Sequence, residues 1–159
     1  MAGQEIDGLD RLVAELQDEA NRAAQEVYSP VVIEHALQPR NLGSIPEPDG
    51  LAIVRGPCGD TMAVFLRLDS TRIEQATFLT DGCGPTLACG SMLTTMIQGL
   101  SLEEASAVEP ADLINALGGP PPDHVHCAVL AVTTLQQAVA HRLKDEAGTS
   151  DKTGEENHP

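Results

Sequence analysis

Residues 51–85 read LAIVRGPCGDTMAVFLRLDSTRIEQATFLTDGCGP, and this stretch decides the fold. Three short runs in it are rich in aliphatic and β-branched residues: 51–54, 61–68 and 73–80. Apolar residues alternate along the second run and therefore share one face of a strand. The Asp-Ser-Thr break at 69–71 predicts a hairpin turn. The stretch thus predicts three antiparallel strands in sequence, which need helices to cover one face of their sheet.

Helical spacing on both sides of this stretch predicts the covering elements. Apolar residues recur every three or four positions in five further segments: 7–27, 30–37, 86–98, 102–117 and 127–143. Ser29 before Pro30 is a typical helix N-cap, and Ser101 with Glu104 has the spacing of a capping box. The order helix, helix, three strands and then helices predicts an α+β fold, in which about four to five helices cover a three-stranded antiparallel sheet.

At 159 residues the chain has the length of one ordinary domain with extensions. We expect residues 1–27 to form an N-terminal helical extension, residues 28–144 to form the domain, and residues 145–159 to form a disordered acidic tail. No stretch approaches the roughly 20 apolar residues of a membrane span, and the opening MAGQEIDGLD lacks the layout of a signal peptide. A cytoplasmic protein without a membrane partner is therefore expected.

The composition argues against nucleic-acid binding. The formal net charge is −15, from 24 acidic and 9 basic residues, and such a charge repels a phosphate backbone. Aromatic residues make up only 2% of the chain, so its core must be aliphatic and it has few surfaces on which bases could stack. The same charge favours solubility and can attract basic surfaces of partner proteins.

Four cysteines in a chain expected in a reducing compartment favour thiolate or metal chemistry over structural disulfides. Cys58 lies in the turn between the first two expected strands. Cys83 lies between two glycines where the third strand passes into a helix, and those glycines let backbone N–H groups approach a bound anion or sulfide. Cys127 follows His126 at the start of the last helix. Because three loops can converge at one sheet edge, we expect a metal site at one end of the sheet.

The spacing of these three cysteines excludes a common zinc-binding pattern. They are 25 and 44 residues apart, whereas zinc fingers and ribbons take their ligands from close CxxC pairs. The fourth cysteine, Cys89, stands at helical spacing inside an expected helix, which favours a buried core residue over a ligand. His124 lies two residues before His126 and can reach the same site by strand-like alternation, while His35 and His141 have no comparable placement.

Five motifs in a fixed order resemble a known family. They are Tyr28-Ser29-Pro30 through Pro39-Arg40-Asn41-Leu42-Gly43, Cys58-Gly59-Asp60, Gly82-Cys83-Gly84, Ser101-Leu102-Glu103-Glu104-Ala105 and His126-Cys127. Over residues 27–144 this order resembles the IscU/NifU-type iron-sulfur cluster scaffold proteins. The resemblance implies an α+β scaffold without enzymatic activity, on which sulfur from a cysteine desulfurase combines with ferrous iron. It implies that the cluster, [2Fe-2S] by preference and [4Fe-4S] as the alternative, then passes to acceptor apoproteins.

The resemblance also assigns the site. It matches the family's cysteines, its aspartate linked to cluster lability and its histidine to five residues here: Cys58, Cys83, Cys127, Asp60 and His126. Soft thiolates hold iron and accept persulfide sulfur, whereas a harder Asp or a His as fourth ligand binds less firmly and leaves a cluster that can depart. Asp60 is our first choice as fourth ligand and His126 the second, with Cys89 and His124 in reserve.

Two departures from the family refine this interpretation. IscU proteins of the bacterial kind carry a Leu-Pro-Pro-Val-Lys chaperone-recognition segment before the His-Cys pair, but the stretch here reads Pro120-Pro121-Pro122-Asp123-His124. His124 replaces the lysine, which counts against a dedicated Hsp70-type chaperone. The 44 residues between Cys83 and Cys127 leave no room for the insertion found in zinc-dependent sulfurtransferases of the SufU kind, which favours the IscU/NifU branch.

Two other functions stay open on the sequence. One is a zinc-dependent sulfurtransferase, in which Cys58 accepts a persulfide while Cys83, Cys127 and Asp60 hold zinc in place of a cluster. The other is a structural zinc protein that only mediates contacts. The extension at 7–27 is expected either to cover apolar surface of the domain or to contact a second subunit, so a homo-oligomer is also considered.

Overall fold

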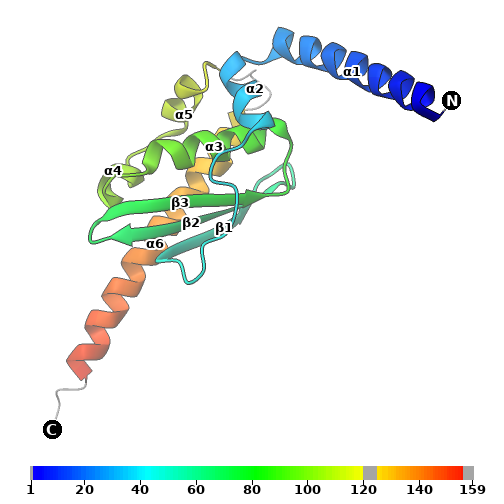
Figure 1. The fold of residues 1–159 in the computed structure, drawn as a ribbon. Coiled ribbons are helices and arrows are strands. Elements are labelled where there is room, and N and C mark those ends of the chain that lie inside the picture. Colours follow the sequence, from blue (N-terminus) through cyan, green and yellow to red (C-terminus); the bar gives the residue numbers. More distant parts are fainter. Residues whose placement is uncertain (1, 120–124, 156–159) are drawn as a thin grey trace.

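The computed structural model describes the backbone of residues 2–119 and 125–155 and the side chains of residues 8–119 and 125–144. Its elements follow the expected order (Figure 1). They are α1 Ala2–Val27, α2 Pro30–Leu37, β1 Gly50–Arg55, β2 Thr61–Asp69, β3 Arg72–Thr80, α3 Gly84–Ile97, α4 Leu102–Ser106, α5 Pro110–Ala116 and α6 Val125–Glu155. The predicted α+β fold is confirmed, and the described ranges contain the five helices α2–α6 in addition to the N-terminal helix α1.

The sheet is the predicted antiparallel meander, with strand order β1-β2-β3. Each observed strand boundary lies within one residue of the prediction. The two-residue hairpin between β2 and β3 places Ser70 in the left-handed region, at a φ of 57°. At the other end of the sheet Arg55 pairs with Thr61 and Met62 pairs with Thr80. The β1–β2 loop and the end of β3 therefore meet at the same edge.

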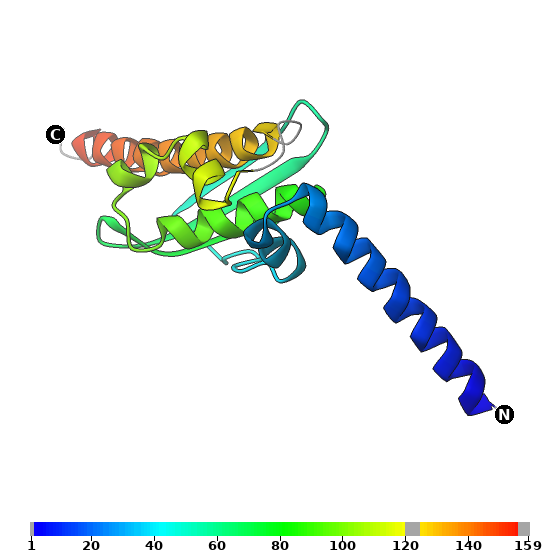
Figure 2. The same ribbon diagram turned by 90° about the horizontal axis from the view of Figure 1, so that it is seen from above.

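Helices α3 and α6 pack on one face of this sheet, and α2 lies against α3 (Figures 1 and 2). The alternating apolar residues of β2 are fully buried under them: Met62, Val64 and Leu66. The core is aliphatic, as the composition predicts, apart from Phe78 of β3. A Cβ atom at Gly90 of α3 would lie only 2.3 Å from Phe78 Cδ2, so this glycine lets α3 approach the sheet closely.

Capping residues predicted from the sequence begin helices α2 and α4. The Ser29 hydroxyl accepts a hydrogen bond from Val32 N at 3.1 Å, and Ser101 and Glu104 form the predicted capping box. Ser29 also donates a hydrogen bond to the carbonyl oxygen of Leu117. The start of α2 is thereby tied to the end of α5.

The two ends of the chain differ from the sequence-based expectations. Helix α1 forms as predicted but projects away from the domain, with Leu9 and Leu16 61% and 57% exposed, so it does not cover the domain's apolar surface (Figures 1 and 2). Helix α6 continues to Glu155, into the stretch 145–159 for which the sequence predicts a disordered acidic tail. Helix propagation adds little cost once a packed segment has nucleated the helix. Residues 156–159 lie outside the described ranges.

No helix in the part of the chain that the structure describes is both long enough and apolar enough to cross a membrane.

Candidate functional site

The loop between β1 and β2 carries the first two candidate residues, as predicted. Two backbone hydrogen bonds close this loop, from Gly56 N to Asp60 O at 2.7 Å and from Gly59 N to Gly56 O at 3.0 Å. Gly59 adopts a φ of 87°, a conformation that favours glycine. The loop leaves Cys58 exposed and Asp60 partly buried at the edge of the sheet.

Cys83 is the N-cap residue of α3, at the junction that the sequence predicts. Polar contacts with the start of β2 hold this junction: Thr61 N donates to Asp81 Oδ1 at 2.7 Å, and Thr80 Oγ1 donates to Thr61 O at 2.6 Å. Gly82 N in turn donates to Thr80 Oγ1 at 3.1 Å. The cysteine is exposed and lies at the same sheet edge as the β1–β2 loop.

The third cysteine lies where the sequence places it, at the start of the last helix. Helix α6 begins at Val125, and Cys127 lies in its first turn with a side chain that is only 1% exposed. The side chain belongs to the core cluster together with Ala128 and Ala131, because the apolar face of α6 already includes it. The half-buried His126 places its Nε2 3.6 Å from Cys127 Sγ. His124 lies outside the described residues.

Thr86, which the sequence reasoning missed, joins these segments. Its fully buried side chain has Oγ1 3.1 Å from Asp60 Oδ2, 3.3 Å from Cys127 Sγ and 3.6 Å from Cys83 Sγ. A Cβ atom at Gly82 would lie 2.7 Å from Thr86 Cβ, so glycine leaves the space that Thr86 occupies. The sequence did contain a signal for Thr86. It stands three positions after Cys83, and residues with this spacing in a helical turn lie on the same helix face.

The pKa of the Cys127 thiol depends on the groups that lie around Thr86. Burial is the main cause that raises the pKa of the Cys127 thiol, and the hydrogen bond with Thr86 opposes it. The charges of Cys83, Asp60 and Cys58 raise this pKa further. All four candidate groups therefore lie within electrostatic reach of one another, although they come from three separate segments of the chain.

Cys89 occupies a different environment. Its side chain is 2% exposed inside α3, and burial, with smaller contributions from Cys127 and Cys83, raises its pKa to about 12. The thiol is thus neutral at physiological pH and packs as a small apolar group. The prediction that Cys89 is a core residue agrees with this burial.

We expect the four cysteines to react unequally with iodoacetamide at pH 8. Exposed Cys58 and Cys83 should be modified first, and Cys89 should stay unmodified until the protein unfolds, because its thiol is buried and protonated. Peptide mass spectrometry after timed quenching measures this order. Denatured protein, in which all four thiols react, is the control, and modification of Cys89 as fast as Cys58 in native protein would contradict the prediction.

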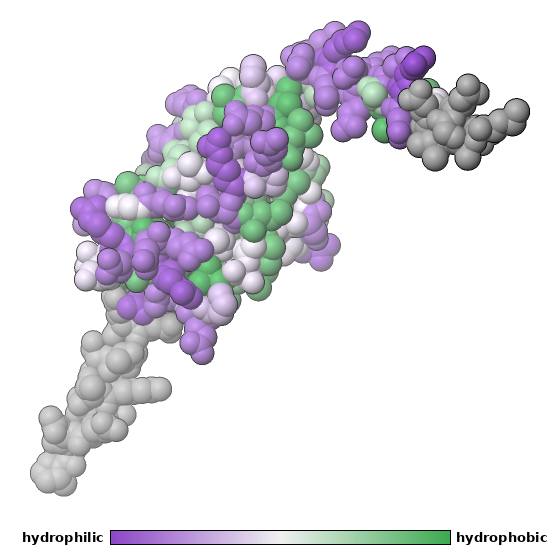
Figure 3. Space-filling view, in the orientation of Figure 1, coloured by the Kyte–Doolittle hydropathy of each residue, from purple (hydrophilic) through white to green (hydrophobic). Residues whose placement is uncertain are grey.

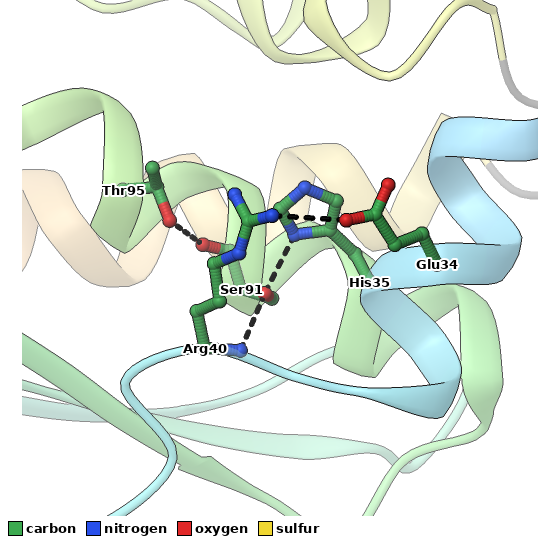
Figure 4. A network of polar contacts seen from close by, with 5 residues as sticks. All are labelled: Glu34, His35, Arg40, Ser91 and Thr95. Atoms are coloured by element: carbon green, nitrogen blue, oxygen red, sulfur yellow. Dashed lines mark hydrogen bonds and ion pairs between the residues drawn. The ribbon is translucent and has the colours of Figure 1, made fainter.

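His35 belongs to a separate polar network that fixes α2 on α3 (Figure 4). Its Nδ1 lies 2.7 Å from Ser91 Oγ, which also accepts a hydrogen bond from Arg40 N at 2.8 Å. The Arg40 side chain pairs with Glu34 at 2.9 Å on the surface. This buried histidine is therefore a structural residue, which agrees with the sequence analysis, where His35 was not assigned to the candidate site.

The described ranges contain no group of three or more His, Cys, Asp or Glu side chains arranged to hold one metal ion. The Thr86 hydroxyl lies between the side chains of Asp60 and Cys127.

An apolar pocket of about 390 Å³ opens beside the β1–β2 loop. It lies between this loop and the first turns of α6, and the following residues line it: Val54, Arg55, Gly56, Pro57, Val125, His126, Val129, Leu130 and Thr133. Val125 and Val129 are 39% and 44% exposed, so the pocket continues into an apolar surface. Because Pro57 precedes Cys58, this surface adjoins the exposed thiol.

Comparison with known proteins gives consistent matches. The family model for the NifU-like N terminal domain matches residues 27–147. The iron-sulfur cluster assembly scaffold protein IscU 1 of Archaeoglobus fulgidus is 37% identical over 130 residues, which cover 81% of this chain and 84% of the relative. The scaffold protein IscU of Escherichia coli is 39% identical over 126 residues, covering 76% and 98%. The N-terminal NifU-like protein from Brucella abortus has the same fold, with a TM-score of 0.61 and 18% identity over 74% of this chain and 95% of that one.

Proposed function

The chain belongs to the family of NifU-like N-terminal domains, and on this basis we propose that it is a scaffold on which an iron-sulfur cluster is assembled and from which the cluster passes to acceptor proteins. One observation carries the proposal: the Thr86 hydroxyl lies within 3.6 Å of the side chains of Asp60, Cys83 and Cys127. Thiols and a carboxylate from distant segments thus share one sheet edge. In this proposal residues 28–144 form the scaffold domain, and the protein carries its cargo without catalysing a reaction.

The proposed ligands have distinct roles. The thiolates of Cys58, Cys83 and Cys127 hold iron, and the exposed Cys58 receives sulfur from a cysteine desulfurase. We place the Asp60 carboxylate as fourth ligand and the imidazole of His126 as its substitute. The cargo is proposed to be a [2Fe-2S] cluster by preference, as the resemblance to the IscU/NifU family implies, with [4Fe-4S] as the alternative, since either cluster takes four protein ligands.

The pairing of Asp60 with Thr86 supports release as well as assembly. A carboxylate oxygen is a harder donor than a thiolate and binds iron less firmly. The Thr86 hydroxyl offers Asp60 an alternative partner at 3.1 Å, so the carboxylate can leave the metal without becoming a buried unpaired charge. A cluster held in this way is bound reversibly.

The proposed partners are the sulfur-donating desulfurase and the acceptor apoproteins. Each must bring its own thiols to the sheet edge, where Cys58 and Cys83 are exposed. The apolar pocket next to the β1–β2 loop, with the exposed Val125 and Val129 at its rim, offers these partners a surface that buries apolar side chains beside the site.

One feature favours a second candidate function. Asp60, Cys83 and Cys127 gather around Thr86, whereas Cys58 stands exposed at the tip of its loop. This division suits a zinc-dependent sulfurtransferase in which Cys58 carries a persulfide and the other three side chains close on zinc when it binds, because in the described residues they are not yet arranged to hold a metal ion.

Anaerobic reconstitution tests the scaffold against this alternative. The purified chain is incubated with ferrous iron, cysteine, a cysteine desulfurase and dithiothreitol, which reduces the transferred persulfide sulfur to sulfide. Cluster formation is followed by visible absorption and Mössbauer spectroscopy. We expect visible charge-transfer absorption from a bound cluster. Cys58→Ser, Cys83→Ser and Cys127→Ser should each lose it, because serine oxygen is a poor ligand for iron in a cluster.

Cys89→Ser is the matched control, because Cys89 is a cysteine of the same domain outside the proposed ligand set, and it should retain the absorption. A wild-type chain that keeps bound zinc and develops no visible absorption would overturn the scaffold proposal in favour of the sulfurtransferase. Loss of the cluster in the correctly folded Cys89→Ser variant would instead contradict the ligand assignment.

A further inference from the structure

Helix α1 presents an uncovered apolar seam with the spacing of a coiled coil. Its members alternate by four and three positions: Leu9, Val13, Leu16, Ala20, Ala23 and Val27. All six side chains are exposed. This alternation keeps one face of a helix towards a partner helix over successive heptads. Leu12 lies beside the seam and widens its outer half.

The domain does not cover this seam. The α1 side chains that line the small pocket against α2 and α3 are those of Asn21 and Ala24, which lie outside the seam. The family model begins at residue 27, so almost all of α1 precedes the part of the chain that is shared with the matched family. The side of α1 visible in Figure 3 is largely hydrophilic, with hydrophobic residues at its margin. The apolar seam of α1 is therefore left uncovered by the domain.

Acidic and neutral residues border the seam. Asp10 and Gln17 occupy flanking positions on one side of the seam, and Glu19 and Glu26 occupy flanking positions on the other side. The two basic residues of the helix, Arg11 and Arg22, lie on its other side. Residues 1–27 contain seven acidic and two basic residues, a net charge of −5. The seam thus favours an occupant with positive charge next to its apolar residues.

This charge distribution selects among the occupants. A second copy of α1 would bring no Lys or Arg to a flanking position, so self-pairing gains no ion pair with the acidic flanking residues. An anionic membrane surface would repel the same residues. We propose that α1 docks a helix of another protein, whose apolar seam is bordered by Lys and Arg side chains.

The seam also indicates how the partner packs. Its outer half carries Leu and Val side chains, which insert between the side chains of a facing helix. Its inner half carries Ala20 and Ala23, and small residues let two helix axes approach more closely. The partner helix is therefore expected to lie nearest to α1 at the end of α1 that adjoins the domain. The rest of the partner would then lie close to the domain.

A designed peptide tests the proposal on the full chain. The probe is a synthetic four-heptad peptide with Ile and Leu at its seam positions and Lys at every flanking position, and the comparison peptide carries Glu at those positions. Fluorescence anisotropy should show that the Lys peptide binds at least about tenfold more tightly than the Glu peptide. Its affinity should fall as salt is added, because the flanking charges are solvent-exposed.

Two variants separate seam docking from general attraction between a basic peptide and an acidic protein. Leu16→Glu adds a negative charge inside the seam, and Gln25→Glu adds the same charge on the outer face of α1. Non-specific attraction would strengthen in both variants. Docking on the seam predicts at least about a tenfold loss of affinity for Leu16→Glu and little change for Gln25→Glu.

Three outcomes would overturn the proposal: equal binding of both peptides, equal behaviour of both variants, or self-association in sedimentation equilibrium that Leu16→Glu abolishes. The last outcome would identify a second copy as the occupant. Because neither variant touches the sheet edge, both should still assemble a cluster. Failure of docking and failure of the scaffold function are therefore distinguishable.

Discussion

An Asp60→Ala variant is expected to retain an assembled cluster about tenfold longer than the wild-type chain in the presence of a chelator. The carboxylate adds negative charge beside three thiolates in a partly buried site, where like charges repel more strongly than in water. Its removal leaves His126, 3.6 Å from Cys127 Sγ, as the neutral fourth ligand. A tenfold change in lifetime corresponds to about 1.4 kcal/mol. The decay of visible absorption after addition of EDTA measures the half-life.

Variants at the same position and at Thr86 show which property of Asp60 matters. Asp60→Asn removes the charge and keeps an oxygen donor, so it should lie between wild type and Asp60→Ala. Thr86→Val removes the hydroxyl that gives Asp60 its alternative partner, while Thr86→Ser keeps that hydroxyl and should behave like wild type. An unchanged or shortened half-life in Asp60→Ala would refute the assigned role of this carboxylate.

A Gly90→Ala variant is expected to lose about 3 kcal/mol of unfolding free energy, which is at the upper end of the cost of overpacking a core. The added Cβ would lie 2.3 Å from Phe78 Cδ2 and 2.4 Å from Phe78 Cε2, and that ring of β3 is fully buried. The gain of about 1 kcal/mol from replacing glycine in a helix does not offset this clash. Urea denaturation followed by circular dichroism measures the change.

Gly8→Ala is the matched control, because Gly8 is also helical but has no other group within 4 Å of the added Cβ. It should leave the stability of the domain unchanged or slightly raised. A Gly90→Ala protein within about 0.5 kcal/mol of wild type would show that α3 can move away from β3 without cost. In that case the position of Cys83 and Thr86 would not depend on this packing contact.

Local chemistry explains which parts of the fold were predictable. The three strands, the hairpin and the caps at Ser29 and Ser101 depend on neighbouring residues, and the structure confirms them. The resemblance to the IscU/NifU family is likewise confirmed by the match over residues 27–147. The direction of α1 and the length of α6 could not be predicted, because both depend on how far a packed segment extends a helix into solvent.

The candidate site was predictable in its segments and not in its contacts. Cys58 and Cys83 lie at the turns that the sequence indicated. The contacts of Thr86 and the burial of Cys127 arise only when α3 and α6 pack together. This packing places Thr86 Oγ1 3.3 Å from Cys127 Sγ, although the two residues are 41 positions apart in the chain. Periodicity alone carries no information on such a pair.

The dispersal of the site along the chain has a consequence for biosynthesis. The β1–β2 loop, the β3–α3 junction and the start of α6 contribute in that order, and the last of them supplies Cys127. A growing polypeptide emerges from its N-terminus, so the sheet and its first two cysteines leave the ribosome before α6 exists. A chain that stops before α6 presents Cys58 and Cys83 without Cys127, so in the proposed scaffold the set of thiolate ligands is complete only after the start of α6 has been synthesised.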